Sequence, residues 1–108
     1  MICEVIKLEA FQKMLQESGD KLVVVNFTAT WCVPCRTIFP VFVDLSEQPD
    51  NKNVVFLKVD VDRAPEITKA CGVLCTPLFQ FYKAGDKGEF TGADADQLNK
   101  LLTEWRNK

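Results

Sequence analysis

An almost uninterrupted apolar run in the first third of the chain constrains the fold more than any other feature of the sequence. The run covers residues 22–27 and reads Leu-Val-Val-Val-Asn-Phe. A strand with one face in water alternates apolar and polar side chains, whereas a strand covered on both faces is apolar throughout and rich in β-branched residues. The run therefore predicts a central strand in a sheet that is covered on both faces.

Helical and extended patterns alternate along the rest of the chain. Residues 2–7 predict an edge strand, and residues 8–17 carry apolar side chains at helical spacing. A second helix runs from the region of Pro34 to a turn at residues 49–51, and Pro40 inside it is expected to kink it. The remaining expected elements are a strand over 54–60, a short helix over 65–71, a hairpin of strands 78–82 and 88–91 around 84–86, and a last helix that begins at Asp94 or Asp96.

The order of these elements predicts the architecture. It reads β-α-β-α-β-α followed by β-β-α. The first part requires parallel strands joined by right-handed crossovers, and the hairpin adds an antiparallel edge. We expect a single domain of the α/β class over residues 1–108, with a central mixed sheet of a parallel core plus an antiparallel hairpin, flanked by helices on both faces.

Composition and charge argue against several classes of function. The 108 residues are 47% hydrophobic and 26% charged, and the net charge is −2. A chain this close to neutral, without a run of lysine or arginine, predicts neither nucleic acid nor a membrane surface as a partner. No apolar stretch is long enough to cross a bilayer, and no basic region followed by an apolar run stands near the N-terminus. We expect a cytoplasmic chain that can also be nuclear.

Five cysteines and no histidine narrow the chemistry further. In a reducing compartment, cysteines more often serve catalysis, metal binding or redox sensing than a disulfide framework. The absence of histidine excludes Cys–His nucleophile pairs and Cys₂His₂ zinc sites. A four-cysteine zinc site formed by Cys32, Cys35, Cys71 and Cys75 is an alternative, although the context of the first pair favours exchange chemistry and we expect no metal.

The motif C-x-x-C at residues 32–35 follows the predicted central strand and opens a helix. The unpaired N–H groups and the positive dipole end of a helix N-terminus stabilise a thiolate, which is the reactive form of cysteine. Cys32, at the edge of the helix, is expected to lie nearest solvent, and Cys35, one turn inside, to be more buried. The pattern predicts that Cys32 is the nucleophile and Cys35 the resolving thiol of thiol–disulfide exchange.

The stretch around this motif is similar to the active-site stretch of animal cytosolic thioredoxins. It covers residues 20–35 and reads DKLVVVNFTATWCVPC. Three further segments match the family in the same order: VDVD at 59–62, CTPLFQF at 75–81 and GEFTGA at 88–93. The resemblance extends over essentially the whole chain and implies the thioredoxin fold. It also implies a redox-active disulfide between Cys32 and Cys35, with no bound cofactor.

The same resemblance implies partners and a binding surface. The electron donor would be thioredoxin reductase, which carries the NADPH and FAD, and the targets would be disulfide-containing proteins. Pro77 would be the family's cis-proline facing the two cysteines, although without the resemblance a trans proline before an edge strand is the simpler interpretation. The backbone of Thr76 would pair with an extended target peptide. The apolar rim around the sulfurs would comprise Trp31, Val33, Pro34, Thr76, Pro77, Gly92 and Ala93.

Two residues near the motif depart from the family pattern. Asn26 stands where the family has a buried aspartate, which helps to deprotonate the resolving thiol through water. Because an amide cannot take that proton, we expect slower resolution of the mixed disulfide and a less affected first attack. A buried carboxylate without partners is costly, so Asn26 is also expected to stabilise the fold by about 1–4 kcal/mol. Val33 replaces the usual glycine and stiffens the turn.

Four more residues near the motif or among the cysteines are considered, and two of them have two interpretations each. Lys58, on the strand beside Asn26, either approaches the site from below or extends to solvent. Cys75 has two interpretations. It is a regulatory thiol, which forms a mixed disulfide with glutathione or links two otherwise monomeric chains, or it has no role. Cys71 is expected to be a small buried residue on a helix, and Cys3 to fill space near the edge strand.

A non-enzymatic function is the main rival hypothesis. Under this hypothesis, a thioredoxin-like chain with residues 26 and 33 altered serves as a redox-regulatory or binding module that captures partners with poor turnover. The presence of both motif cysteines argues against a complete loss of redox activity. Reduction of insulin, first with dithiothreitol and then with thioredoxin reductase, separates the two hypotheses.

Overall fold

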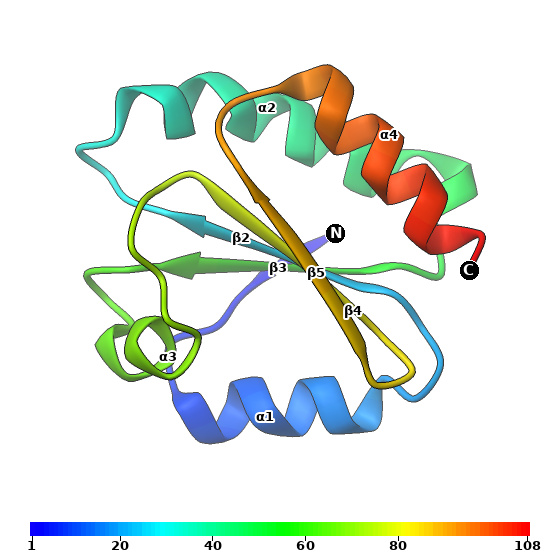
Figure 1. Ribbon diagram of the computed structural model, residues 1–108, viewed down its shortest axis with the longest axis horizontal. Helices are drawn as coiled ribbons and strands as arrows, with labels where there is room; N and C mark the ends of the chain where they lie inside the picture. The colour runs from blue at the N-terminus through cyan, green and yellow to red at the C-terminus, as the bar shows by residue number, and fades with distance from the viewer.

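A five-stranded mixed sheet in the order β1-β3-β2-β4-β5 forms the centre of the fold (Figure 1). The computed structural model describes residues 1–108. Strands β1, β3 and β2 are parallel to one another, whereas β4 runs antiparallel to both β2 and β5. The strands are Ile2–Glu4 (β1), Val23–Thr28 (β2), Val55–Asp60 (β3), Leu78–Lys83 (β4) and Asp86–Thr91 (β5).

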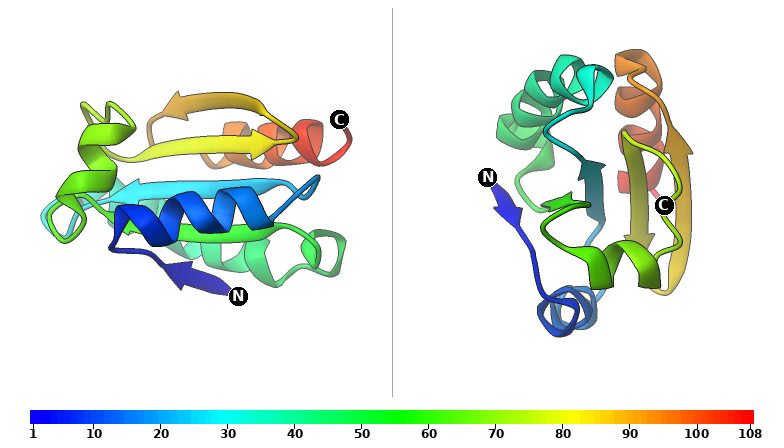
Figure 2. Two further views of the ribbon diagram at one scale, coloured as in Figure 1. Left: turned by 90° about the horizontal axis from the view of Figure 1, so that it is seen from below. Right: turned by 90° about the vertical axis from the view of Figure 1, so that its left-hand side faces the viewer.

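Four α-helices cover the two faces of this sheet (Figures 1 and 2). Helices α2 and α4 lie on one face, and α1 and α3 lie on the other. This arrangement confirms the α/β architecture predicted from the sequence. No helix combines the length and the apolar character that a membrane span requires. The helices are Leu8–Glu17 (α1), Val33–Glu47 (α2), Pro65–Ala70 (α3) and Ala95–Arg106 (α4), and a 3₁₀ turn covers Pro49–Asn51.

Strand β2 is buried along its whole length, as its apolar sequence predicts. Because successive side chains of a strand point to opposite faces, β2 contributes to two separate cores. Val24 packs with Phe42 and Phe79 in the core under α2 and α4. Val25 and Phe27 pack in the core that faces α1 and α3. The central strand is therefore anchored from both sides, and the loop at its end has a rigid base.

The structure corrects two of the predicted boundaries. Strand β1 ends at Glu4 rather than at residue 7, because Lys7 already serves as the N-cap of α1 and the chain has to leave the sheet before it. The backbone N–H of Val5 still donates to the carbonyl of Lys58 at 2.9 Å. The hairpin turn is tighter than expected: only Ala84 and Gly85 lie outside the strands, both with positive φ, as a two-residue turn of this kind requires.

The start of the last helix is settled by a side-chain cap. The carboxylate of Asp94 accepts the backbone N–H of Gln97 at 3.0 Å, so Asp94 and not Asp96 is the N-cap of α4. Helix α2 continues through Pro40 to Glu47. The predicted positions of the helices are otherwise confirmed to within one or two residues.

Gly88 on β5 packs directly under the indole of Trp105. A substitution at residue 88 tests whether this close packing contributes to stability. A Cβ atom at residue 88 would lie 2.5 Å from Cζ2 and 3.2 Å from Cε2 of that ring. The ring is itself stacked on Phe81 with 5.9 Å between centroids, so it has little freedom to move. Gly88→Ala is expected to lower the free energy of unfolding by about 1–3 kcal/mol, measured by urea denaturation.

The control is a double-mutant cycle with Trp105→Leu, whose smaller side chain leaves room for the added methyl group. In that background the cost of Gly88→Ala should largely disappear. An equal cost in both backgrounds would contradict the steric explanation.

Candidate active site

The two motif cysteines lie where the central strand passes into α2. Strand β2 ends at Thr28, and a short loop leads to Cys32, which has extended backbone angles (φ −88°, ψ 107°) and is the N-cap of α2. The backbone N–H of Cys32 donates to the carbonyl of Ala29 at 3.2 Å, and the N–H of Arg36 donates to the carbonyl of Cys32 at 3.3 Å. These bonds hold the first sulfur at the carboxyl end of the most buried strand.

Cys32 and Cys35 are joined by a disulfide. The backbone N–H of Cys35 also donates to Sγ of Cys32 at 3.2 Å, so one of the unpaired donors of the helix N-terminus points at that sulfur. The first turn contains no acidic residue, and Pro34 occupies it as predicted. The positive end of α2 therefore acts on Cys32 without a nearby carboxylate on the helix to oppose it.

Both sulfur-bearing residues are buried in this oxidised form. Cys32 is 5% exposed and Cys35 is 2% exposed, and the two pack against Ala29. Cys32 is the more exposed of the two, which is the predicted order, but both are buried. Attack on a target consequently depends on close docking of the target against the surface around Cys32.

The loop before β4 and the end of β5 lie beside the cysteine loop. In the sheet, Phe27 pairs with Leu78, and Leu78 pairs with Thr91, so Pro77 and Gly92 follow the same edge as the end of β2. The Thr76–Pro77 peptide bond is cis, as the resemblance implied. The N–H of Gly92 donates to the carbonyl of Pro77 at 3.0 Å and ties the two segments together.

The predicted rim residues differ in exposure. Pro77 is buried, Thr76 and Gly92 are half-buried, and Ala93 and Pro34 are exposed. Two large apolar side chains of the rim, Trp31 and Val33, are exposed.

Trp31 is 67% exposed and Val33 is 61% exposed. They provide apolar surface directly beside Cys32, where the sequence analysis placed the rim.

Two residues at this end of the sheet, Asp62 and Leu74, were not predicted as part of the site from the sequence. The indole N–H of Trp31 donates to Oδ2 of Asp62 at 2.8 Å, which links the loop after β3 to the cysteine loop. Leu74 is 97% exposed in the loop that leads to Pro77. Neither feature has a local sequence signal, because the first joins residues far apart in the chain and the second depends on how the loop folds.

Asn26 lies in the middle of β2, in register with Lys58 on β3 and with Phe79 on β4. Its side chain is almost completely buried, and its Nδ2 has no hydrogen-bond partner. Leaving such a donor unpaired costs about 1–3 kcal/mol, so the amide is itself an imperfect fit. A charged carboxylate in the same place would cost more.

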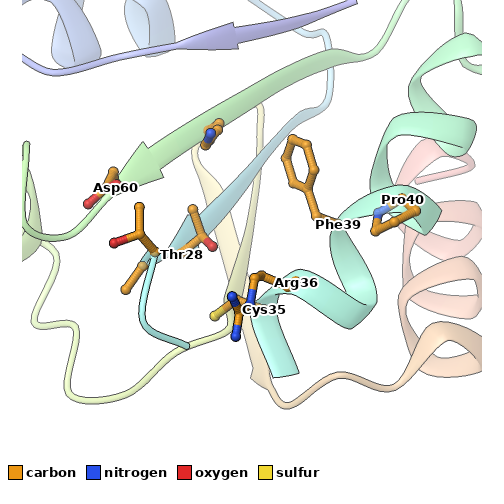
Figure 3. Close-up of a pocket in the computed structure, with 9 residues that line it drawn as sticks. Thr28, Cys35, Arg36, Phe39, Pro40 and Asp60 are labelled. Carbon is orange, nitrogen blue, oxygen red and sulfur yellow. The ribbon is translucent and has the colours of Figure 1, made fainter. Parts of the chain in front are cut away.

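A pocket of about 330 Å³ lies beside Cys35, between α2 and the strands β2 and β3 (Figure 3). Lys58 and Cys35 both line it, and Lys58 is half-buried. The Nζ of Lys58 lies 5.1 Å from the centre of the Phe39 ring. The other lining residues are Thr28, Ala29, Thr30, Arg36, Pro40 and Asp60.

The three other cysteines are free thiols. Cys75 and Cys3 are exposed, which for Cys3 corrects the expectation that it fills space. Cys71 ends α3 and is half-buried, with its Sγ 4.0 Å from the hydroxyl of Tyr82. Burial raises the pKa of the Cys71 thiol, against smaller opposing effects of the Tyr82 hydrogen bond and the Lys87 charge.

The four-cysteine zinc arrangement is not formed. Nowhere in the structure do three histidine, cysteine, aspartate or glutamate side chains gather as a metal site would require. Cys32 and Cys35 are instead bonded to each other.

Comparison with known proteins decides the family. The sequence model of the thioredoxin family matches residues 3–104. The chain belongs to the thioredoxin family. It is 49% identical over 105 residues to thioredoxin of Ictalurus punctatus, covering 96% of this chain and 98% of that one. It is 52% identical over 98 residues to thioredoxin of Mus musculus, covering 90% and 91% of the two chains.

The fold agrees with solved thioredoxin structures. The thioredoxin of Malassezia sympodialis, Mala s 13, superposes with a TM-score of 0.89 at 37% identity and covers 97% of this chain and 93% of its own. The thioredoxin fold predicted from the sequence is thereby confirmed. Like its relatives, this chain is a disulfide oxidoreductase, and its redox centre is the Cys32–Cys35 disulfide with no bound cofactor.

Asn26→Asp tests how a carboxylate at residue 26 affects stability and turnover. At pH 7 the variant is expected to unfold with a free energy about 1–4 kcal/mol lower than the parent. Because burial raises the pKa of a carboxyl group, the loss should shrink toward pH 4, where the group becomes protonated in both states. The same variant is expected to turn over faster in a reductase-coupled assay, because a carboxylate can take the proton of Cys35.

Asn99→Asp, on the exposed side of α4, controls for the added negative charge and should change neither property. If Asn26→Asp left turnover unchanged and the protein no less stable, the interpretation of residue 26 would be wrong.

Proposed function

We propose that this chain reduces the disulfides of other proteins, with Cys32 as the nucleophile and Cys35 as the resolving thiol. The observation that carries the proposal is the disulfide at the start of α2, whose Cys32 sulfur accepts the backbone N–H of Cys35. In the reduced protein, the same helix N-terminus stabilises the Cys32 thiolate.

The reaction proceeds in two exchanges. The Cys32 thiolate attacks one sulfur of a target disulfide, and the other target sulfur leaves with the electron pair of the broken bond. Cys35 then loses its proton and attacks Sγ of Cys32, so the mixed disulfide breaks and the second target sulfur leaves as a thiolate that takes up a proton. The target gains two electrons, and the Cys32–Cys35 disulfide forms again.

The surface around the sulfurs is suited to an extended target segment. Thr76 is half-buried in the loop before β4, and its backbone is proposed to pair with a target strand. Trp31 and Val33 offer exposed apolar area next to Cys32. We assign target binding to the rim residues Trp31, Val33, Pro34, Thr76, Pro77, Gly92 and Ala93.

Thioredoxin reductase is the proposed electron donor, with NADPH and FAD acting only in that enzyme. The 48–52% identity to animal thioredoxins over most of the chain supports this assignment. The proposed setting is electron transport and redox homeostasis in the cytoplasm, and also in the nucleus.

Insulin reduction tests the function. The chain is expected to reduce insulin with dithiothreitol as the donor and also with NADPH and thioredoxin reductase. Cys32→Ser should abolish both activities, whereas Cys35→Ser should accumulate a covalent complex with the target, detected by mass spectrometry. Cys3→Ser is the matched control and should keep full activity.

Inactivity with both donors would contradict the proposal. Activity with dithiothreitol alone would favour the rival function, a redox-regulatory or binding module outside the usual electron chain.

Cys75 is proposed as the thiol that links two monomers under oxidation, because it is exposed while Cys71 is half-buried. Treatment with hydrogen peroxide is expected to yield a dimer on non-reducing gels that Cys75→Ser no longer forms. Cys71→Ser should still form it, because burial raises the pKa of the Cys71 thiol and keeps it protonated. A dimer that survives in Cys75→Ser would contradict this assignment.

A further inference from the structure

The pocket between α2 and the ends of β2 and β3 is formed by one face of the sheet and one side of a helix (Figure 3). Because the side chains of a strand alternate between two faces, Thr28 points to the face on which Val24 packs under α2. Lys58 and Asp60 of β3 point to the same face, since Asp60 is the register partner of Thr28. The helix contributes three residues at spacings of three and four, which lie on one side of a helix: Arg36, Phe39 and Pro40.

The wall of this pocket is mostly apolar. Ala29, Phe39 and Pro40 supply apolar surface, and a small number of polar side chains lie between them. Sites for small molecules have the same character, and their volumes begin at about 300 Å³. With a volume of about 330 Å³, this pocket is suited to a small ligand that has an apolar body.

The hydroxyl group of Thr28 has no partner within the protein. The hydroxyls of Thr37, Thr68 and Thr103 each donate to a backbone carbonyl, whereas that of Thr28 does not. Thr28 is only 8% exposed, but its oxygen is not sealed off, because Nδ2 of Asn26 is the one fully buried side-chain polar atom without a partner. The hydroxyl therefore opens into the pocket that Thr28 lines, where a ligand can bond to it.

Lys58 supplies an ammonium group that also lacks a polar partner. The residue is half-buried, and its Nζ lies 5.1 Å from the centre of the Phe39 ring. Glu4 and Glu47 border a hollow on its other side, but neither forms an ion pair with it. Glu4 is paired with Arg63 instead. A partly buried ammonium group without a counter-ion favours an anionic ligand.

The other charged residues of the wall determine which anion fits. The Oδ1 atom of Asp60 accepts the backbone N–H groups of Asp62 at 2.9 Å and Arg63 at 3.3 Å, which hold this carboxylate in place. Arg36 is exposed, so water screens its charge. Two cations and one carboxylate leave one net positive charge on the wall. A ligand with a single negative charge therefore matches the pocket, whereas a dianion is repelled by Asp60.

We propose that this pocket binds a small aromatic carboxylate. The carboxylate of the ligand accepts hydrogen bonds from the ammonium group of Lys58 and the hydroxyl of Thr28. Its aromatic body packs against Phe39 and Pro40. This inference goes beyond disulfide exchange: the ligand lies beside Cys35 without reacting, and no covalent bond forms or breaks.

Calorimetric titration of the oxidised protein with naphthoate at pH 7 tests the site. In this form Cys32 and Cys35 are joined, as in the structure, so thiol chemistry plays no part. We expect binding with a Kd of about 0.1–1 mM, as is usual for a ligand of this size. Naphthamide has nearly the same shape but no charge, and it is expected to bind about three- to tenfold more weakly.

Variants of the two polar residues separate their contributions. Lys58→Met should weaken the binding of naphthoate about three- to tenfold and leave that of naphthamide unchanged. Lys58→Arg keeps the charge and should bind naphthoate within about twofold of the parent. Thr28→Val replaces the hydroxyl with a methyl group of similar size and should weaken both ligands about two- to fivefold. Lys100→Met removes an exposed charge on α4 and should change neither affinity.

Amide chemical shifts measured by NMR during the titration locate the ligand. The signals of Thr28 and Phe39 are expected to move, while those of the exposed Trp31 and Leu74 stay in place. No binding of naphthoate up to about 10 mM would overturn the inference. Equal affinities for naphthoate and naphthamide, unchanged naphthoate binding in Lys58→Met, or shifts confined to Trp31 and Leu74 would each overturn it as well.

Discussion

The arrangement of the site depends on one constraint, which is that β2 is buried on both faces and ends where α2 begins. Because Val24 and Val25 pack into opposite cores, the end of the strand cannot shift, and Cys32 is placed at the first unpaired donors of the helix. The pairing of β2 with β4 brings Pro77 to the same edge. The sulfur, the helix dipole and the loop that contains Pro77 are thus positioned by a single strand.

The interior of the same strand carries one buried polar side chain. Asn26 is almost completely buried, and its Nδ2 has no hydrogen-bond partner, so the amide fits its surroundings imperfectly. A charged carboxylate in the same place would cost more, because burial penalises a charge more than a neutral amide. The sheet therefore tolerates a polar group at this position as long as the group is neutral.

Much of the fold was predictable because its signals are local. The apolar run at 22–27, the helical spacing at 8–17 and the C-x-x-C motif each specify their own element, and the order of elements then restricts the topology. The errors lie where distant contacts or tight geometry decide. Strand β1 is shortened by the start of α1, and the bond from Trp31 to Asp62 joins loops 31 positions apart. The near-equal burial of Cys32 and Cys35 likewise depends on packing that no sequence pattern records.

The most direct measurement is the order in which the reduced protein's cysteines react with a limiting amount of iodoacetamide between pH 5 and 8, located by mass spectrometry. The account predicts that Cys32 is modified first throughout this range, including below pH 7, where an ordinary thiol is almost fully protonated. Modification of Cys32 no faster than that of the exposed Cys3 would show that the start of α2 does not activate the sulfur, and the redox assignment of this site would fall.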